Sequence, residues 1–225
     1  MPAVTLTDPP IELQTAPEPR AAVIWLHGLG ADGHDFAGII PELGLPPGAA
    51  VRFVFPHAPM RPVTINGGYV MRAWYDIAMG ATGFVQNREH LAEAVEITNG
   101  LIRREVERGI APGRIALGGF SQGGAVVVHT ALRYPQRLAG VVSLSAPTPY
   151  LDDLFREASP ANADLPMFIA HGRYDPMVPF AHGEAVARAL QARGRAVEWH
   201  DYNLEHNVSL EEIRDIGRFL ARVLA

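Results

Sequence analysis

The chain has 225 residues, of which 48% are hydrophobic and 19% charged, so it can bury a sizeable core and is not expected to be disordered. Its 19 basic residues are all arginine, lie scattered among 24 acidic ones and form no basic run, so no nucleic-acid partner is expected. No cysteine occurs, which excludes disulfides, thiolate metal sites and cysteine nucleophiles, and the absence of lysine excludes Schiff-base chemistry.

The first residues, through Pro19, are rich in proline and lack the basic region and apolar run of a secretion signal. We expect them to form an edge strand or an arm. Apolar runs elsewhere are too short to span a bilayer, so we expect no stable membrane insertion and a cytoplasmic location. No domain boundary is visible, and residues 1–225 are expected to form a single domain.

Short β-branched runs alternate with longer helical patterns, which is typical of a mostly parallel sheet with helices on both faces. Strands are expected at residues 22–26, 51–55, 114–117, 139–144, 166–170 and 197–202. Helices are expected at residues 88–108, 125–132, 184–193 and 210–224. Ligands bind at the carboxyl edge of such sheets, so functional residues are expected in the loops that follow strands.

Residues 58–87 do not follow this alternation. They are rich in proline, glycine and aromatic residues, and they show no sustained period. A connection of this length inside a compact domain is usually either functional or flexible. We therefore expect a flap or short hairpin that leans over the active site and helps to bind substrate.

The segment Gly119-Phe120-Ser121-Gln122-Gly123 matches the motif G-x-S-x-G. In this motif the serine lies on a strained turn between a strand and a helix, and the glycines let the two elements approach closely. An apolar strand pattern precedes the motif and a helical pattern follows it, as the motif requires. This context favours Ser121 as a nucleophile over a glycine-rich turn without function.

A serine nucleophile needs a base and a third group that orients the base. In the fold that carries this motif, the acid and then the histidine follow the serine along the chain, each after a later strand. Asp175 follows the strand predicted at 166–170, and His206 follows the strand predicted at 197–202. They are the predicted orienting acid and general base.

Other acids and histidines fit these roles less well. Asp164 precedes its strand and so lies at the opposite edge, whereas His200 and Asp201 fall inside a strand. His171 ends its strand and is expected to orient the Asp175 loop. The remaining candidates are expected at the surface, at a helix start or in hydrogen-bonded core positions: Asp152, Asp153, His34, His57, His90, His129 and His182.

The loop His27-Gly28-Leu29-Gly30 follows the first strong strand. An oxyanion hole needs one N–H from such a loop and one from the residue after the nucleophile, which nominates the amides of Leu29 and Gln122. The alternative is a glycine loop that only turns the chain. A phosphate-binding loop fits less well, because neither the G-x-G-x-x-G spacing nor a P-loop lysine occurs. Without H-x-H or H-E-x-x-H motifs, no metal site and no cofactor are expected.

With these residues in view, the chain resembles the phospholipase/carboxylesterase family, which includes bacterial carboxylesterases and acyl-protein thioesterases. The resemblance covers roughly residues 22–224 and is strongest in VIWLHGLGADGHDF, RPVTINGGYVMRAWYDI, GGFSQGGAVVVHTAL, HGRYDPMVPF and EHNVSLEEIRDI. It implies a cytosolic α/β-hydrolase with the triad Ser121, Asp175 and His206 and the oxyanion amides of Leu29 and Gln122. It also implies that Trp74-Tyr75-Asp76 and their loop border an apolar acyl groove, and that homodimers are common.

The expected function is therefore that of a serine carboxylesterase that works through an acyl-enzyme. Its substrate is expected to be a small-molecule or lipid-like acyl ester, with thioesters and lysophospholipids as possible variants. Leu29, Trp74 and Met177 are apolar candidates for substrate binding, although core packing would explain any one of them equally well. The alternatives are an inactive ligand-binding protein on a hydrolase scaffold, and a lactone or amide hydrolase.

Overall fold

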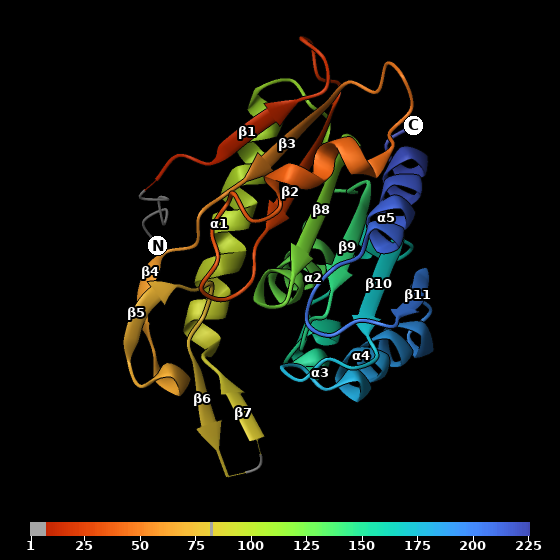
Figure 1. The fold of residues 1–225 in the computed structure, drawn as a ribbon. Coiled ribbons are helices and arrows are strands. Elements are labelled where there is room, and N and C mark those ends of the chain that lie inside the picture. Colours follow the sequence, from red (N-terminus) through yellow and green to blue (C-terminus); the bar gives the residue numbers. More distant parts are fainter. Residues whose placement is uncertain (1–7, 82) are drawn as a thin grey trace.

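Seven strands form the central sheet of the computed structural model, which describes residues 8–81 and 83–225. Their order is β1-β3-β2-β8-β9-β10-β11 (Figure 1). All neighbouring strands pair in parallel except β1, which runs antiparallel to β3 at the edge. The strands are β1 (Ile11–Gln14), β2 (Ala21–Leu26), β3 (Val51–Phe55), β8 (Ile115–Phe120), β9 (Gly140–Leu144), β10 (Met167–Gly172) and β11 (Val197–Tyr202).

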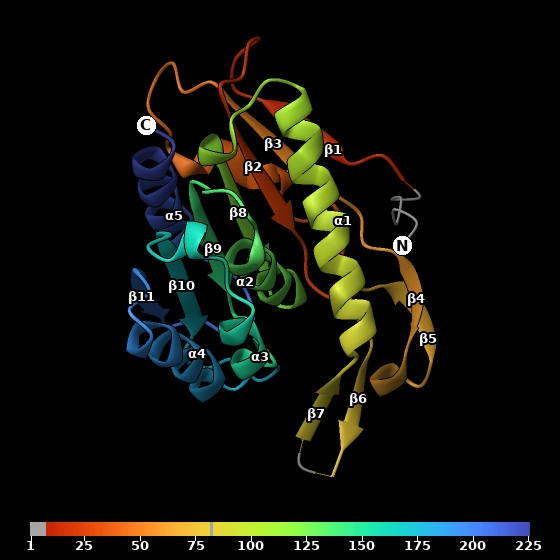
Figure 2. The same ribbon diagram turned by 180° about the vertical axis from the view of Figure 1, so that it is seen from behind.

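Helices cover both faces of this sheet, which confirms the predicted α/β-hydrolase fold. One face carries α1 (Arg88–Glu107), α2 (Gln122–Arg133), α4 (Phe180–Ala192) and the short α3 (Leu151–Arg156), as Figure 2 shows from behind. The opposite face is covered by α5 (Leu210–Val223) and by the 3-10 helix η1 (Ala37–Leu43), which contact each other (Figure 1).

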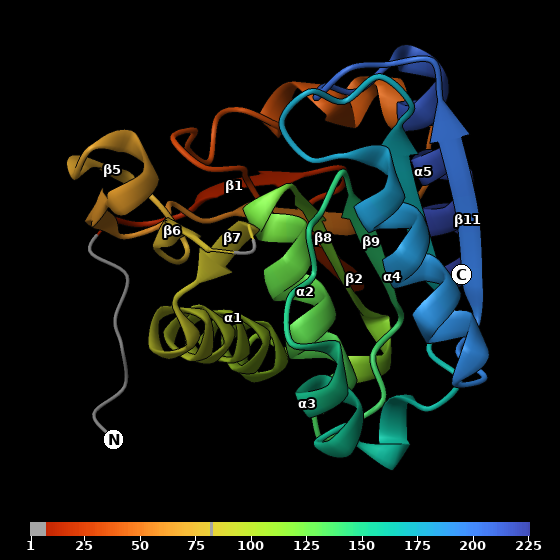
Figure 3. The ribbon, with the colours of Figure 1, turned by 90° about the horizontal axis from the view of Figure 1, so that it is seen from below.

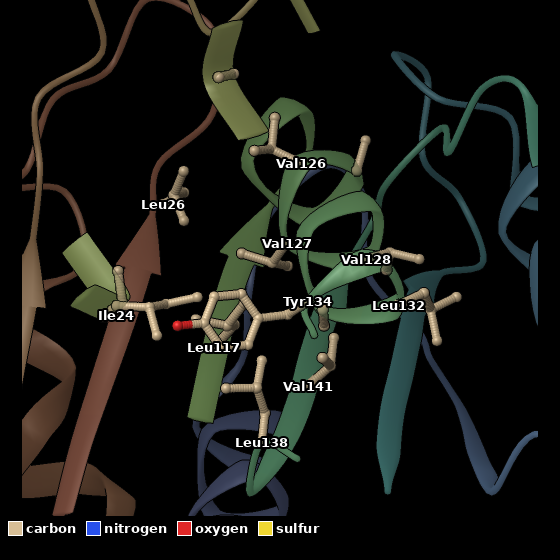
Figure 4. Packing of buried hydrophobic residues seen from close by; sticks show 14 of the residues in the cluster. Ile24, Leu26, Leu117, Val126, Val127, Val128, Leu132, Tyr134, Leu138 and Val141 are labelled. Carbon is tan, nitrogen blue, oxygen red and sulfur yellow. The ribbon is translucent and has the colours of Figure 1, made fainter. Parts of the chain in front are cut away.

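The strand side chains alternate between two hydrophobic clusters, one on each face. In β2, Ile24 packs toward α1 and α2, whereas Trp25 packs toward η1 and α5. Figure 4 shows the first cluster, in which Ile24, Leu117 and Val127 lie together. Every residue of β2 is buried because both faces are covered, and this explains its uninterrupted apolar sequence.

The observed elements depart from the predicted bounds in a few places. Helix α2 begins at Gln122 rather than at residue 125, because Gly123 and Gly124 continue the helix in spite of their low helix propensity. Helix α4 begins at Phe180 rather than at 184, and neither α3 nor η1 was predicted. The proline-rich start does provide an edge strand, β1, as predicted.

Residues 60–86 form two short antiparallel hairpins in place of a regular crossover. β4 (Met60–Val63) pairs with β5 (Tyr69–Arg72), and β6 (Ile77–Gly80) pairs with β7 (Gly83–Gln86). The Asp76 carboxylate accepts hydrogen bonds from the N–H and the hydroxyl of Thr64, both at 2.7 Å, which ties the hairpins together. Both hairpins lie beside the start of α1, beyond the end of the sheet where β2 and β8 finish (Figures 1 and 3).

Within the described ranges, no helix is long and apolar enough to cross a membrane.

Candidate active site

Ser121 occupies the sharp turn between β8 and α2. Its backbone has φ 53° and ψ −118°, a strained conformation for a residue with a side chain, and its N–H donates to the Leu144 carbonyl at 2.8 Å. A Cβ on Gly123 would lie 2.2 Å from the Leu26 carbonyl oxygen, and one on Gly119 would lie 2.4 Å from the carbonyl carbon of Gly123. Both motif glycines are therefore required by close backbone contacts around the serine.

Asp175 and His206 are joined by a hydrogen bond of 2.7 Å between the carboxylate Oδ2 and the imidazole Nδ1. The other oxygen, Oδ1, accepts the N–H groups of Met177 and Val178, both at 2.8 Å. These bonds hold the carboxylate, whose side chain is completely buried, in one orientation. Since Nδ1 donates its proton to Asp175, Nε2 is the ring nitrogen of His206 that can accept one.

His171, at the end of β10, contacts the loop that carries Asp175. The buried imidazole of His171 donates from Nε2 to the Val178 carbonyl at 2.9 Å and lies 3.4 Å from Oδ2 of Asp175. Burial lowers the pKa of His171, which favours the neutral ring. A Cβ on Gly183 would lie 2.1 Å from Nδ1, so α4 closes over the ring. His171 thus orients the Asp175 loop, as the sequence predicted.

Several of the rival acids and histidines lie away from this cluster, and His182 is an exception, because it lines the same pocket as Ser121 and His206. Asp164 forms an ion pair with Arg137 at the opposite end of β10, and Asp201 pairs with Arg173. The ring of His200 stacks on Phe168 with a centroid separation of 4.4 Å. Asp153 pairs with arginines at the α3 surface, and His129 is buried with its ring bonded to the Pro149 carbonyl and to Arg133.

Leu29 and Gln122 line the same pocket as Ser121. Among residues 8–81 and 83–225, neither N–H has an acceptor within the protein. Both groups are therefore available to a substrate oxygen.

His27 fixes the direction of the Leu29 N–H. Its Nε2 accepts the Ala58 N–H at 3.0 Å, and its Nδ1 donates to the Gly28 carbonyl at 2.7 Å. That carbonyl belongs to the same planar peptide as the Leu29 N–H, which therefore points the opposite way. Burial lowers the pKa of His27 to about 4, so the ring is neutral and keeps this donor–acceptor arrangement near neutral pH.

A pocket of about 360 Å³ joins Ser121 and His206 to the hairpins. Its walls are mostly apolar, and they include the predicted groove residues Leu29 and Met177. Several other lining residues are not predicted individually from the sequence. No periodic pattern shows which side chains of the irregular segment 58–87, or of later segments, face the pocket. These other lining residues are Ile65, Asn66, Met71, Ile77, Phe84, Gln86, Pro147 and His182.

Trp74 does not line this pocket, which corrects the expectation that it borders the acyl groove. Its side chain is completely buried, and the indole Nε1 donates to the His27 carbonyl at 2.9 Å. The backbone N–H of Trp74 donates to Oε1 of Gln122 at 3.0 Å. The acceptor of the Trp74 indole is thus on the loop that leads to Leu29 and not at the pocket surface.

No group of three or more potential metal-ligating side chains gathers in the described part of the chain.

The sequence profile of the Phospholipase/Carboxylesterase family matches residues 9–224. The chain belongs to the phospholipase/carboxylesterase family. Among its relatives, the acyl-protein thioesterase 1 of Yarrowia lipolytica is 35% identical over 217 residues, which cover 94% of this chain and 96% of that protein. Membership confirms the resemblance drawn from the motifs.

Solved structures agree with the phospholipase/carboxylesterase assignment. SOBER1 of Arabidopsis thaliana has a TM-score of 0.84 and 30% identity, covering 92% of this chain and 100% of that one. Acyl-protein thioesterase 2 of Zea mays has a TM-score of 0.83 and 28% identity, covering 96% of this chain and 99% of that one. Membership of the phospholipase/carboxylesterase family makes the chain a serine hydrolase that acts on ester bonds.

Proposed function

We propose that the chain hydrolyses carboxylic esters and thioesters through a triad of Ser121, His206 and Asp175. The observation that carries this proposal is the 2.7 Å bond between Asp175 and His206, on the same pocket as the strained Ser121. The bond leaves Nε2 of His206 as the basic nitrogen, and Ser121 and His206 both line the pocket. An orienting acid, a base and a nucleophile are the groups that acyl transfer by serine requires.

The reaction proceeds in two steps. His206 takes the hydroxyl proton of Ser121 while the serine oxygen attacks the carbonyl carbon, and the negative oxygen forms against the amides of Leu29 and Gln122. Each such donor contributes about 3 kcal/mol to stabilising the transition state. The protonated His206 then gives its proton to the departing alcohol or thiol. Water attacks the acyl-enzyme by the same route and releases the acid.

The acyl group is proposed to lie in the pocket between the two hairpins. Their side chains Ile65, Met71, Ile77 and Phe84 form an apolar wall there, and Met177 lies on the Asp175 loop. Such a wall suits a hydrocarbon chain, and relatives are named acyl-protein thioesterases. In this proposal, residues 58–87 are a substrate-binding insertion within a single domain. A homodimer and a cytoplasmic location stay predictions from the sequence.

The proposal is tested with p-nitrophenyl esters from acetate to palmitate and with a fluorophosphonate probe. Ser121→Ala is expected to lower kcat by more than about 10³-fold and to abolish labelling, because no other group supplies the nucleophile. Ser145→Ala is the matched control, because Ser145 also has a positive φ (46°), whereas its buried side chain does not line the pocket. Full activity in folded Ser121→Ala would refute the triad, and a folded wild type without activity or labelling would favour a binding protein.

A further inference from the structure

We infer that Trp74 and Gln122 are positioning residues, whose side chains hold the two oxyanion N–H groups in place through one buried hydrogen-bond frame. The frame consists of the Gln122 amide, the Trp74 indole and the backbone of residues 72–75. The inference rests on the proposed function, because it concerns the amides that face the acyl oxygen. It also gives Trp74 a role other than contact with substrate.

The Gln122 side chain ties the start of α2 to the Trp74 segment. Its Oε1 accepts the Trp74 N–H at 3.0 Å, and its Nε2 donates to the Tyr75 carbonyl at 2.8 Å. These two partners fix the orientation of the amide, since a backbone N–H needs the oxygen and a carbonyl needs the nitrogen. Gln122 is only 1% exposed, so water does not compete for these bonds. Gln122 therefore anchors the residue whose own N–H forms half of the oxyanion hole.

The same segment holds the loop that carries the other amide. The Trp74 indole donates to the His27 carbonyl at 2.9 Å, and the Gly30 N–H donates to the Arg72 carbonyl at 2.9 Å. These bonds fix the peptides immediately before and after the peptide that contains the Leu29 N–H. Residues 72–75 thus contact both halves of the oxyanion hole and set the distance between them.

Trp25 shows that a buried indole N–H in this fold does not always have a hydrogen-bond acceptor. Trp25 is also buried, at 1% exposure, yet its Nε1 has no partner among the described residues. A buried indole N–H is therefore tolerated without an acceptor elsewhere in this core. The bond from Trp74 ends on the oxyanion loop, where donor positions matter to a few tenths of an ångström.

The matched pair Trp74→Phe and Trp25→Phe separates positioning from core packing. Both variants shorten a buried aromatic ring, but only Trp74→Phe removes a bond to the oxyanion loop. We expect kcat of Trp74→Phe to fall by about 10-fold, with KM within about 2-fold, as when a transition-state contact is weakened. An aryl boronic acid, which forms a tetrahedral adduct on Ser121, is expected to lose affinity by the same factor. Trp25→Phe is expected to retain kcat and boronate affinity.

Gln122→Met provides the second half of the experiment. It keeps the length of the side chain, removes both hydrogen bonds and leaves the Gln122 backbone in place. We expect a similar fall in kcat and boronate affinity, and a combined loss in Trp74→Phe/Gln122→Met that is smaller than the product of the two single losses. Non-additive losses of this kind are expected when two side chains belong to one hydrogen-bond network.

Two outcomes overturn the inference. The first is a Trp74→Phe protein whose kcat and boronate affinity match those of Trp25→Phe. The second is a loss confined to the unfolding midpoint. If Trp74→Phe does not fold, Trp74→3-benzothienylalanine removes the N–H and keeps the ring shape, with the same change at Trp25 as its control. Activity in Ser121→Ala would instead refute the proposed function, and so the two failures are distinguishable.

Discussion

The two walls of the pocket are built in opposite ways. Beneath the wall that carries Ser121, Leu29 and Gln122, the supporting groups are almost completely buried, with His27 and Gln122 at 1% exposure. The hairpin wall, in contrast, is open to solvent, with Phe84 at 45% exposure. The first wall holds the proposed reacting groups on buried supports, whereas the second presents an apolar surface that is partly exposed to solvent.

This difference shows where substitutions are tolerated. A Cβ added to either motif glycine would lie only 2.2 to 2.4 Å from backbone atoms, so no methyl group fits at these positions beside Ser121. On the hairpins, the large apolar side chains that stand in solvent are Met60, Tyr69, Val70, Met79, Phe84 and Val85. Exposed side chains of this kind usually change stability by less than about 0.5 kcal/mol when replaced. The chemistry of the protein is thus tightly constrained by packing, and its acyl preference is open to change.

The largest effect is expected for Asp175→Asn, which alters the buried wall without changing its shape. The asparagine cannot both accept from Nδ1 of His206 and accept the two N–H groups that Oδ1 now binds. The imidazole then loses the orientation and the tautomer that Ser121 needs. We expect kcat for p-nitrophenyl butyrate to fall by about 10³- to 10⁴-fold.

Asp164→Asn is the matched control for this change. Asp164 precedes β10, whereas Asp175 follows it, and its ion pair with Arg137 lies at the surface. The control is expected to keep kcat within about 2-fold, because exposed pairs contribute about 0–1 kcal/mol to stability and Asp164 contacts no pocket residue. An active Asp175→Asn would contradict the assignment of the acid.

The buried wall was largely predictable from the sequence. Ser121 followed from its glycine spacing, and Asp175 and His206 followed from chain order and from their positions after strands. These signals work because each reflects a local constraint, either a close backbone contact or the end of a buried strand. The assignment of the Leu29 and Gln122 amides to an oxyanion hole rests on the same turn geometry and stays a prediction.

The hairpin wall could not be predicted in this way. The segment 58–87 was recognised as irregular, but its pairing into two hairpins depends on contacts between short strands of weak pattern. The family resemblance and the apolar side chain place Trp74 at the groove, but an aromatic residue in a loop gives no sign of which way it faces. Its buried position depends on acceptors at His27 and Gln122, which are distant in sequence.

A smaller effect, confined to substrate choice, is expected on the open wall. Phe84 lines the pocket, whereas its neighbour Val85 does not, since successive strand residues face opposite sides. We expect Phe84→Ala to lower kcat/KM for long-chain p-nitrophenyl esters by about 5-fold relative to acetate, the equivalent of about 1 kcal/mol of lost apolar contact. Val85→Ala is expected to leave this ratio within about 2-fold. Equal ratios in the two variants would show that the acyl chain lies elsewhere.

The smallest effect concerns Glu212, which lies in the first turn of α5, just after the His206 loop. The Glu212 N–H donates to the Ser209 hydroxyl at 3.2 Å, which caps the start of α5. The carboxyl is buried, and burial raises its pKa to about 8. Folding therefore requires this group to be neutral at pH values where it is ionised in the unfolded chain.

The raised pKa of Glu212 lowers the free energy of unfolding as the pH rises. A folded-state pKa of about 8 against an ordinary value of 4.5 means that the stability present below pH 4.5 is lost as the pH rises toward 8. Glu212→Gln stays neutral at every pH and keeps the backbone N–H that donates to Ser209. We expect it to raise the free energy of unfolding in urea by about 1–3 kcal/mol near pH 7.5, with no gain near pH 4 and an unchanged kcat. Glu211→Gln, at the exposed neighbouring position, is expected to show no such gain, and a gain independent of pH in Glu212→Gln would point to packing rather than ionisation. If the gain depends on pH as expected, the protein can be made more stable without any change to the groups that line the pocket.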